Sequence, residues 1–222
     1  MFDPDPYPPI VYWAHVVFGF AASAAALLAL AATKGARLHV RSGRVYAFGM
    51  IVASLSALTF AAIRFSPPVL FDSLLMLYAL STALLAHQAP SAAVRFLETL
   101  FTGVGVLATL ALTAAGVAFA TQGSLNVVPA GLHALIFGSL VVGDFRFRRR
   151  DRATERHHRH LVRMAWAVAI GAYAPLFTFR EVFGLGSMTV YFVGMSLGPI
   201  ILLAFRSQAL SLAAATPKPR VP

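Results

Sequence analysis

Seven long apolar runs divide this 222-residue chain, and they limit its possible folds more than any other feature of the sequence. A helix that crosses the hydrocarbon core of a bilayer needs about 20 predominantly apolar residues. A continuous segment of this kind must be helical, because no water is present to satisfy its backbone groups. The sequence therefore predicts an all-α protein, an integral membrane bundle of seven transmembrane helices. The expected helices cover about residues 10–32, 45–63, 69–86, 99–120, 127–143, 161–179 and 187–205.

The amino-acid composition excludes the water-soluble classes of protein. The chain is 59% hydrophobic and 12% charged, whereas an ordinary soluble domain is about 45–50% apolar and about 25% charged. So few polar residues could not cover the surface of a soluble globule of this size. Cysteine is absent, which excludes disulfides and thiolate metal sites.

Basic residues are distributed unevenly between the segments that join the apolar runs. Sixteen of the 18 Lys and Arg residues fall on the side that includes the C-terminal tail, and only Arg64 and Arg180 fall on the other. Cytoplasmic segments of membrane proteins carry the excess of basic residues, so the N-terminus is expected outside and the C-terminus inside. We expect a short extracytoplasmic N-terminus (1–9), a membrane domain (10–205) and a cytoplasmic tail (206–222).

Eight arginines lie between Arg146 and Arg163, in the most basic segment of the chain. We expect this segment to be a solvated cytoplasmic loop that contacts anionic lipid headgroups. No known nucleic-acid-binding module accompanies the arginines, so the lipid bilayer is the expected partner and nucleic acid is not.

Three ionisable side chains are predicted at nearly one depth on the outer side. His15, Asp72 and His133 lie five, three and six residues inside their runs, or about 7, 5 and 9 Å at 1.5 Å per residue. Ionisable groups inside a membrane are costly and therefore point to function. Three interpretations stay open: a polar packing cluster without a cofactor, axial ligation of haem b by His15 and His133, or a divalent metal ion bound by both histidines and Asp72.

The other five histidines are expected at the cytoplasmic side. His39, His87 and His158 are candidate ligands of a second haem there, while His157 and His160 have the i, i+3 spacing that allows shared metal binding. Imidazoles at two depths would suit electron transfer across the membrane through two haems, to or from a quinone or another redox partner.

Three functions remain open from the sequence. The first is haem or metal binding near the outer leaflet with transmembrane electron transfer. The second is a non-enzymatic assembly factor or small-solute carrier whose polar layers are structural. The third is a metal-dependent intramembrane hydrolase. No GxSxG, P-loop or HExxH motif occurs, so no catalytic residue can be named.

The segment from Lys34 to Tyr46 reads KGARLHVRSGRVY. It resembles the H-x-x-x-G-R-x-Y loop of bacterial multi-pass membrane proteins of unknown function (the domain-of-unknown-function 2306 type). The region around Arg159 and Arg163 is similar to their H-R-x-W-M-x-R stretch, although Leu and Val replace the Trp-Met pair. The resemblance is good over about residues 10–60 and implies a location in the bacterial inner (cytoplasmic) membrane, with no settled activity.

Glycines predict two local features. In the segment that resembles this family, we expect Gly43 to adopt a positive φ where the chain reverses into the second run, with His39 folded back toward His87 or the histidines at 157–160. Gly194 and Gly198 form a small-xxx-small pair, which predicts close approach of a neighbouring helix.

Overall fold

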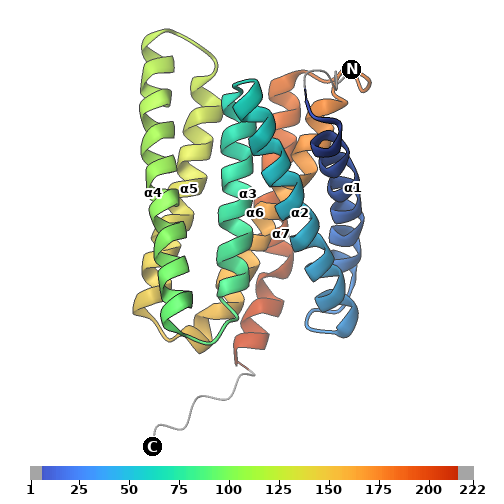
Figure 1. The fold of residues 1–222 in the computed structure, drawn as a ribbon. Coiled ribbons are helices and arrows are strands. Elements are labelled where there is room, and N and C mark those ends of the chain that lie inside the picture. The colour runs from blue at the N-terminus through green and yellow to red at the C-terminus, as the bar shows by residue number, and fades with distance from the viewer. Residues whose placement is uncertain (1–6, 215–222) are drawn as a thin grey trace, which may run out of the picture. The chain divides into compact units, whose positions relative to one another are not determined.

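A computed structural model describes residues 7–214 of the chain, with side chains described up to Phe205. Seven helices and no strand occur in this part of the chain (Figure 1), which confirms the predicted all-α fold. Each helix is long and apolar enough to cross a membrane, so the chain is a multi-pass membrane protein. The helices are α1 (Pro9–Ala31), α2 (Arg37–Ile63), α3 (Pro67–Leu85), α4 (Ala92–Thr121), α5 (Val127–Arg149), α6 (Arg152–Thr178) and α7 (Ser187–Ala214).

Several helices extend well beyond the apolar runs. Helix α4 begins seven residues before the predicted position, and α7 continues to Ala214, into the predicted tail. A helix persists as long as its backbone hydrogen bonds form, whereas hydropathy marks only the part that lipid can surround. The predicted orientation stays a prediction, and the predicted N-terminal segment and tail lie partly outside the described residues, at 1–6 and 215–222.

The prediction of a solvated loop between Arg146 and Arg163 is wrong. Helix α5 runs to Arg149 and α6 begins at Arg152, so nearly the whole segment is helical. Asp151 stabilises the start of α6, because its carboxylate accepts hydrogen bonds from the Thr154 hydroxyl (2.7 Å) and the Ala153 amide (3.3 Å). These bonds, that of the Thr154 hydroxyl first, lower the pKa of Asp151.

The turn predicted at Gly43 is also misplaced. Gly43 lies inside α2, and the chain reverses at Gly35, which has a φ of 81°. Lys34 closes α1 by donating hydrogen bonds from Nζ to the carbonyls of Leu30 (2.7 Å) and Ala29 (3.0 Å). The last carbonyls of a helix receive no hydrogen bond from within it, so the ammonium group supplies the donor that they lack.

The chain divides into two compact units. Unit 1 comprises the chain up to Leu80 together with Ala165–Ile201, and unit 2 comprises Ser81–Met164 together with the residues from Leu202 onward. In unit 1, α1 packs along α2; in unit 2, α4 packs along α5 (Figure 1).

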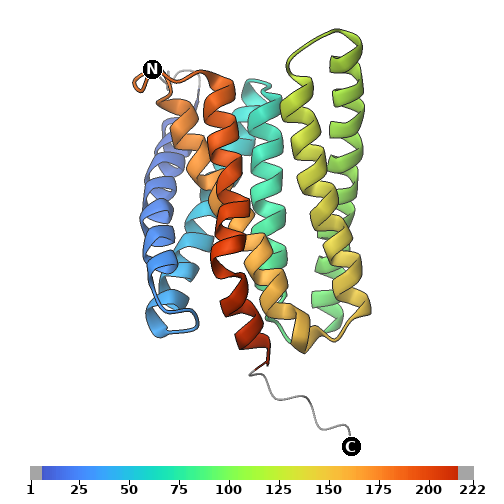
Figure 2. The same cartoon turned by 180° about the vertical axis from the view of Figure 1, so that it is seen from behind.

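Close packing between α6 and α7 within unit 1 confirms the prediction for Gly194 and Gly198 (Figure 2). A Cβ atom at Gly194 would lie 2.7 Å from the Tyr173 Cβ and 3.2 Å from its Cα, and a Cβ at Gly198 would lie 2.8 Å from the Trp166 ring. Only glycine leaves room for this approach.

We predict that Gly194→Ala lowers the free energy of unfolding by about 1–3 kcal/mol, because the added methyl group meets backbone as well as side-chain atoms. Gly103→Ala is the matched control, since a Cβ there has no neighbour within 4 Å. Unfolding of both variants in detergent, followed by tryptophan fluorescence, measures the difference. Equal stability of the two variants would contradict the prediction.

Candidate functional site

Unit 2 contains a set of buried charged side chains contributed by three helices. Glu98 on α4 is 3% exposed, Asp144 on α5 is fully buried, and Arg159 and Arg163 on α6 are 5% and 1% exposed. Charged residues are almost never buried to this degree unless they are paired. We call these four residues, together with Thr102, Arg148 and Arg152, the arginine network.

Arg159 joins the two acidic residues of the network. Its Nη1 donates to Glu98 Oε1 at 2.8 Å, while Nη2 and Nε donate to Asp144 Oδ1 at 2.8 and 3.2 Å. The guanidinium carbon also lies 4.2 Å from the centre of the Phe147 ring. One planar side chain therefore holds α4, α5 and α6 together, using the fixed donor geometry that distinguishes arginine from lysine.

Arg163, Arg152 and Thr102 make further contacts with the two carboxylates. Arg163 donates to Asp144 and, at 2.6 Å, to the Leu140 carbonyl, and Arg152 Nη1 donates to Glu98 Oε1 at 3.1 Å. Thr102 Oγ1 lies within hydrogen-bond distance of Asp144 Oδ2 (3.3 Å).

Positive charge exceeds negative charge in this region. Three guanidinium groups pair with two carboxylates, Arg148 adds a fourth that bonds the Glu98 carbonyl and Thr102, and Arg156 adds a fifth within electrostatic range of His87. The Nε atoms of Arg152 and Arg156 are buried, and neither has a hydrogen-bond partner among the described residues. A buried donor without an acceptor is costly, so the region is chemically suited to an additional anion.

Three of the predicted cytoplasmic histidines gather beside these arginines. The His87 ring centre lies 4.9 Å from that of His160 and 5.4 Å from that of His157. Burial first, and then the charges of His157, Arg156 and Arg152, lower the pKa of His87. His87 is therefore neutral at pH 7.

The other two predicted cytoplasmic ligands are His158 and His39. The His158 side chain is exposed, although the preceding residue, His157, contacts His87. His39 Nδ1 lies 3.0 Å from the Ala29 carbonyl and so joins the start of α2 to the end of α1 within unit 1. Its binding role stays a prediction.

His15 and His133 each have one ring nitrogen fixed by a backbone carbonyl. His15 Nδ1 lies 2.8 Å from the Ala53 carbonyl, and His133 Nδ1 lies 3.0 Å from the Pro129 carbonyl. A carbonyl can only accept, so Nδ1 carries the hydrogen in both residues and Nε2 is the basic nitrogen.

Asp72 lies near two tyrosine hydroxyls in unit 1. It lies within electrostatic range of the Tyr173 and Tyr191 hydroxyls, and these two rings are 5.6 Å apart. His15 and Asp72 belong to unit 1 and His133 to unit 2. Across the described part of the chain, no group of three or more His, Asp or Glu residues is arranged to hold a metal ion.

Glu98 was not among the predicted site residues, although the sequence contains a signal for it. Within α4, Arg95 and Glu98 are the only charged residues of a 30-residue helix. The predicted run began at residue 99, immediately after Glu98, because an apolar run is defined to stop at the first charged residue. A helix that starts earlier places this carboxylate inside the bundle of α4, α5 and α6.

Comparison with family models, with curated proteins and with solved structures finds no match for the chain. The resemblance over residues 10–60 accordingly stays a prediction.

We predict that Arg159→Met lowers the free energy of unfolding by about 3–5 kcal/mol, because it removes a shared donor from two buried carboxylates. Arg149→Met is the control, since the Arg149 side chain is exposed and such substitutions usually change stability by less than about 0.5 kcal/mol. Denaturant titration of both purified variants provides the measurement, and a loss of stability no greater for Arg159→Met than for the control would contradict the structural role of the network.

Proposed function

We propose that the protein binds a small anion, of the carboxylate or phosphate type, beside Arg152, Arg156 and His87 in unit 2. The carrying observation is the pair of buried Nε donors of Arg152 and Arg156, in a region where guanidinium groups outnumber carboxylates. Ionisable groups within membrane helices mark functional sites by default, because their burial is costly. This function belongs to the non-enzymatic, solute-binding alternative.

The electrostatics of the region favour an anion over a metal ion. The arginine charges that oppose protonation of His87 would oppose a divalent cation there more strongly, since the repulsion scales with the charge of the ion. A neutral His87 retains one N–H donor for an anion. His87 thus complements the arginines as an additional donor.

Arg156 provides the sharpest test, because it donates no hydrogen bond within the described part of the chain, and its replacement leaves the network intact. We predict that inorganic phosphate raises the melting temperature of the detergent-solubilised protein above that measured with chloride at equal ionic strength. Arg156→Gln is expected to lose most of this shift, because charge-assisted hydrogen bonds to an anion are worth about 1.5–3 kcal/mol.

Arg149→Gln is the matched control and is expected to keep the shift, because the substitution removes the same charge from an exposed position. Equal shifts with phosphate and chloride, or equal losses in both variants, would overturn the proposed site in favour of general screening.

A second candidate function rests on the fixed tautomers of His15 and His133. Histidines that ligate metals almost always donate their other ring nitrogen to a carbonyl, carboxylate or water, and both residues make such a bond. We propose that Nε2 of each is a ligand atom for haem iron or another metal ion.

An absorption spectrum of protein expressed with ample haem tests this second function. We predict a Soret band in the purified protein, and a weaker band in each of His15→Ala and His133→Ala. His158→Ala is the control, since that side chain is exposed. A colourless, metal-free preparation would exclude the haem and metal function and would leave the anion site untouched.

A further inference from the structure

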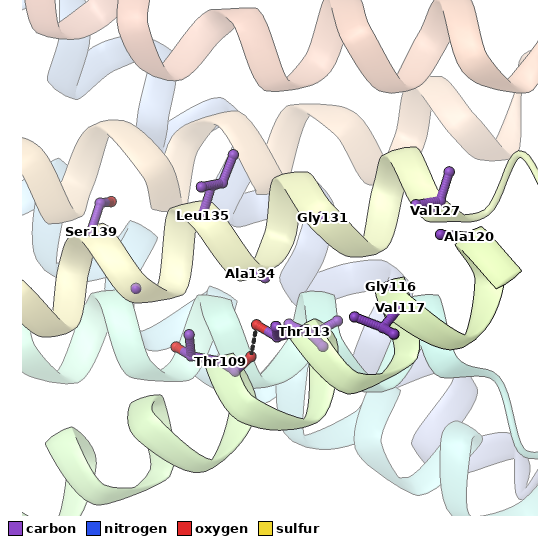
Figure 3. Close-up of a pocket in the computed structure, with 12 residues that line it drawn as sticks. Thr109, Thr113, Gly116, Val117, Ala120, Val127, Gly131, Ala134, Leu135 and Ser139 are labelled. Atoms are coloured by element: carbon purple, nitrogen blue, oxygen red, sulfur yellow. Dashed lines mark hydrogen bonds between the residues drawn. The ribbon is translucent and has the colours of Figure 1, made fainter.

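An open apolar groove runs along the contact between α4 and α5 in unit 2 (Figure 3). It has a volume of about 750 Å³ and is lined almost entirely by apolar surface. Gly116 and Gly131 lie close to each other across this contact, where a Cβ at Gly116 would be 3.9 Å from the Gly131 nitrogen. Val117 and Leu135 flank the groove and are 61% and 72% exposed.

The groove ends on the side of unit 2 that contains the arginine network. On α4, Thr109 lines the groove and Thr102 belongs to the network seven residues earlier, two turns along the same face. On α5, Ser139 lines the groove and Arg148 lies nine residues further along the helix, or about 13 Å. At 1.5 Å per residue, Thr102 lies about 10 Å beyond the end of the groove.

Arg148 supplies a positive charge at this end. Its Nη2 donates to the Glu98 carbonyl (2.7 Å) and to Thr102 Oγ1 (2.8 Å), which fixes the guanidinium against α4. Nη1 and Nε make no hydrogen bond within the described residues, and the side chain is exposed. An apolar groove with a held guanidinium group beyond its end is complementary to a molecule with an acyl chain and an anionic headgroup.

We propose that this groove is a binding site for an anionic phospholipid, with an acyl chain along Gly116 and Gly131 and the phosphate at Arg148. The volume lies within the range of about 300–1,000 Å³ that is usual for ligand sites. Under the predicted orientation, Arg148 faces the cytoplasmic leaflet, where anionic lipids attract basic residues. The proposal uses different residues from the small-anion site, so either can hold without the other.

Two substitutions separate the headgroup from the acyl chain. Arg148→Gln removes the charge, and Gly131→Leu adds a side chain to the groove lining at a position where a Cβ has no neighbour within 4 Å. The controls are Arg149→Gln for the charge and Gly103→Leu for the added side chain, since Gly103 is equally open and does not line the groove.

Native mass spectrometry of detergent-solubilised protein titrated with phosphatidylglycerol, and with phosphatidylcholine of the same chains, measures binding. We expect a preference for phosphatidylglycerol, lowered about five-fold in Arg148→Gln, which corresponds to about 1 kcal/mol per basic residue at a membrane surface. We expect Gly131→Leu to weaken binding of both lipids, and both controls to bind like the natural chain.

The ratio between the two lipids reports on the site even if a variant is less stable, because a general loss of stability affects both titrations alike. Absence of a preference, or a preference that Arg148→Gln retains, would overturn the headgroup assignment. Unchanged binding in Gly131→Leu would overturn the groove. Displacement of phosphatidylglycerol by inorganic phosphate alone would show that Arg148 recognises a free anion, which also contradicts a phospholipid site.

Discussion

The burial of two carboxylates between α4, α5 and α6 is the interaction on which unit 2 depends. Glu98 and Asp144 are withdrawn from water, and the desolvation of a charged group costs several kcal/mol unless donors replace the lost water. Arg159 meets both, and Arg152 and Arg163 each meet one. Because each acid needs arginines from α6, the three helices are fixed relative to one another in this unit.

The same requirement creates the positive charge that gives the unit its chemistry. More guanidinium groups than carboxylates enter the region, so the two acids cannot neutralise it. Burial first, and then the neighbouring positive charges, lower the pKa of His87, and the excess charge disfavours cations. The arginines that stabilise the helices thus also favour a negatively charged ligand beside Arg156.

The sequence predicts the helices well and the network poorly, for physical reasons. Seven apolar runs suffice to count the helices, because a membrane leaves a segment of that length no other structure. The pair Gly194 and Gly198 likewise predicts a close contact, since spacing alone places both on one face. The burial of Arg159 is different, because it depends on a partner 61 residues away. From the sequence alone, a cluster of arginines indicates a solvated loop. Only the structure shows that α4 begins early enough to place Glu98 beside these arginines. The site predictions for His15, Asp72 and His133 share this difficulty, since depth within a run does not show which faces meet.

The contact between α4 and α5 is polar at one end and apolar along the groove, and this difference distinguishes the two proposed ligands. A hydrogen bond from Arg148 to Thr102 joins the helices at one end, whereas backbone lies near backbone at Gly116 and Gly131. The two glycines leave no side chain to fill the space beside the contact between the helices, which accounts for the open groove. A small hydrophilic anion gains nothing from an apolar groove, while an acyl chain gains about 0.8 kcal/mol for each methylene group buried. The groove and Arg148 therefore suit an amphiphile, and the buried donors of Arg152 and Arg156 suit a small anion. Both proposed ligands are attracted by the positive charge of unit 2, but only the amphiphile also gains from the apolar surface next to it.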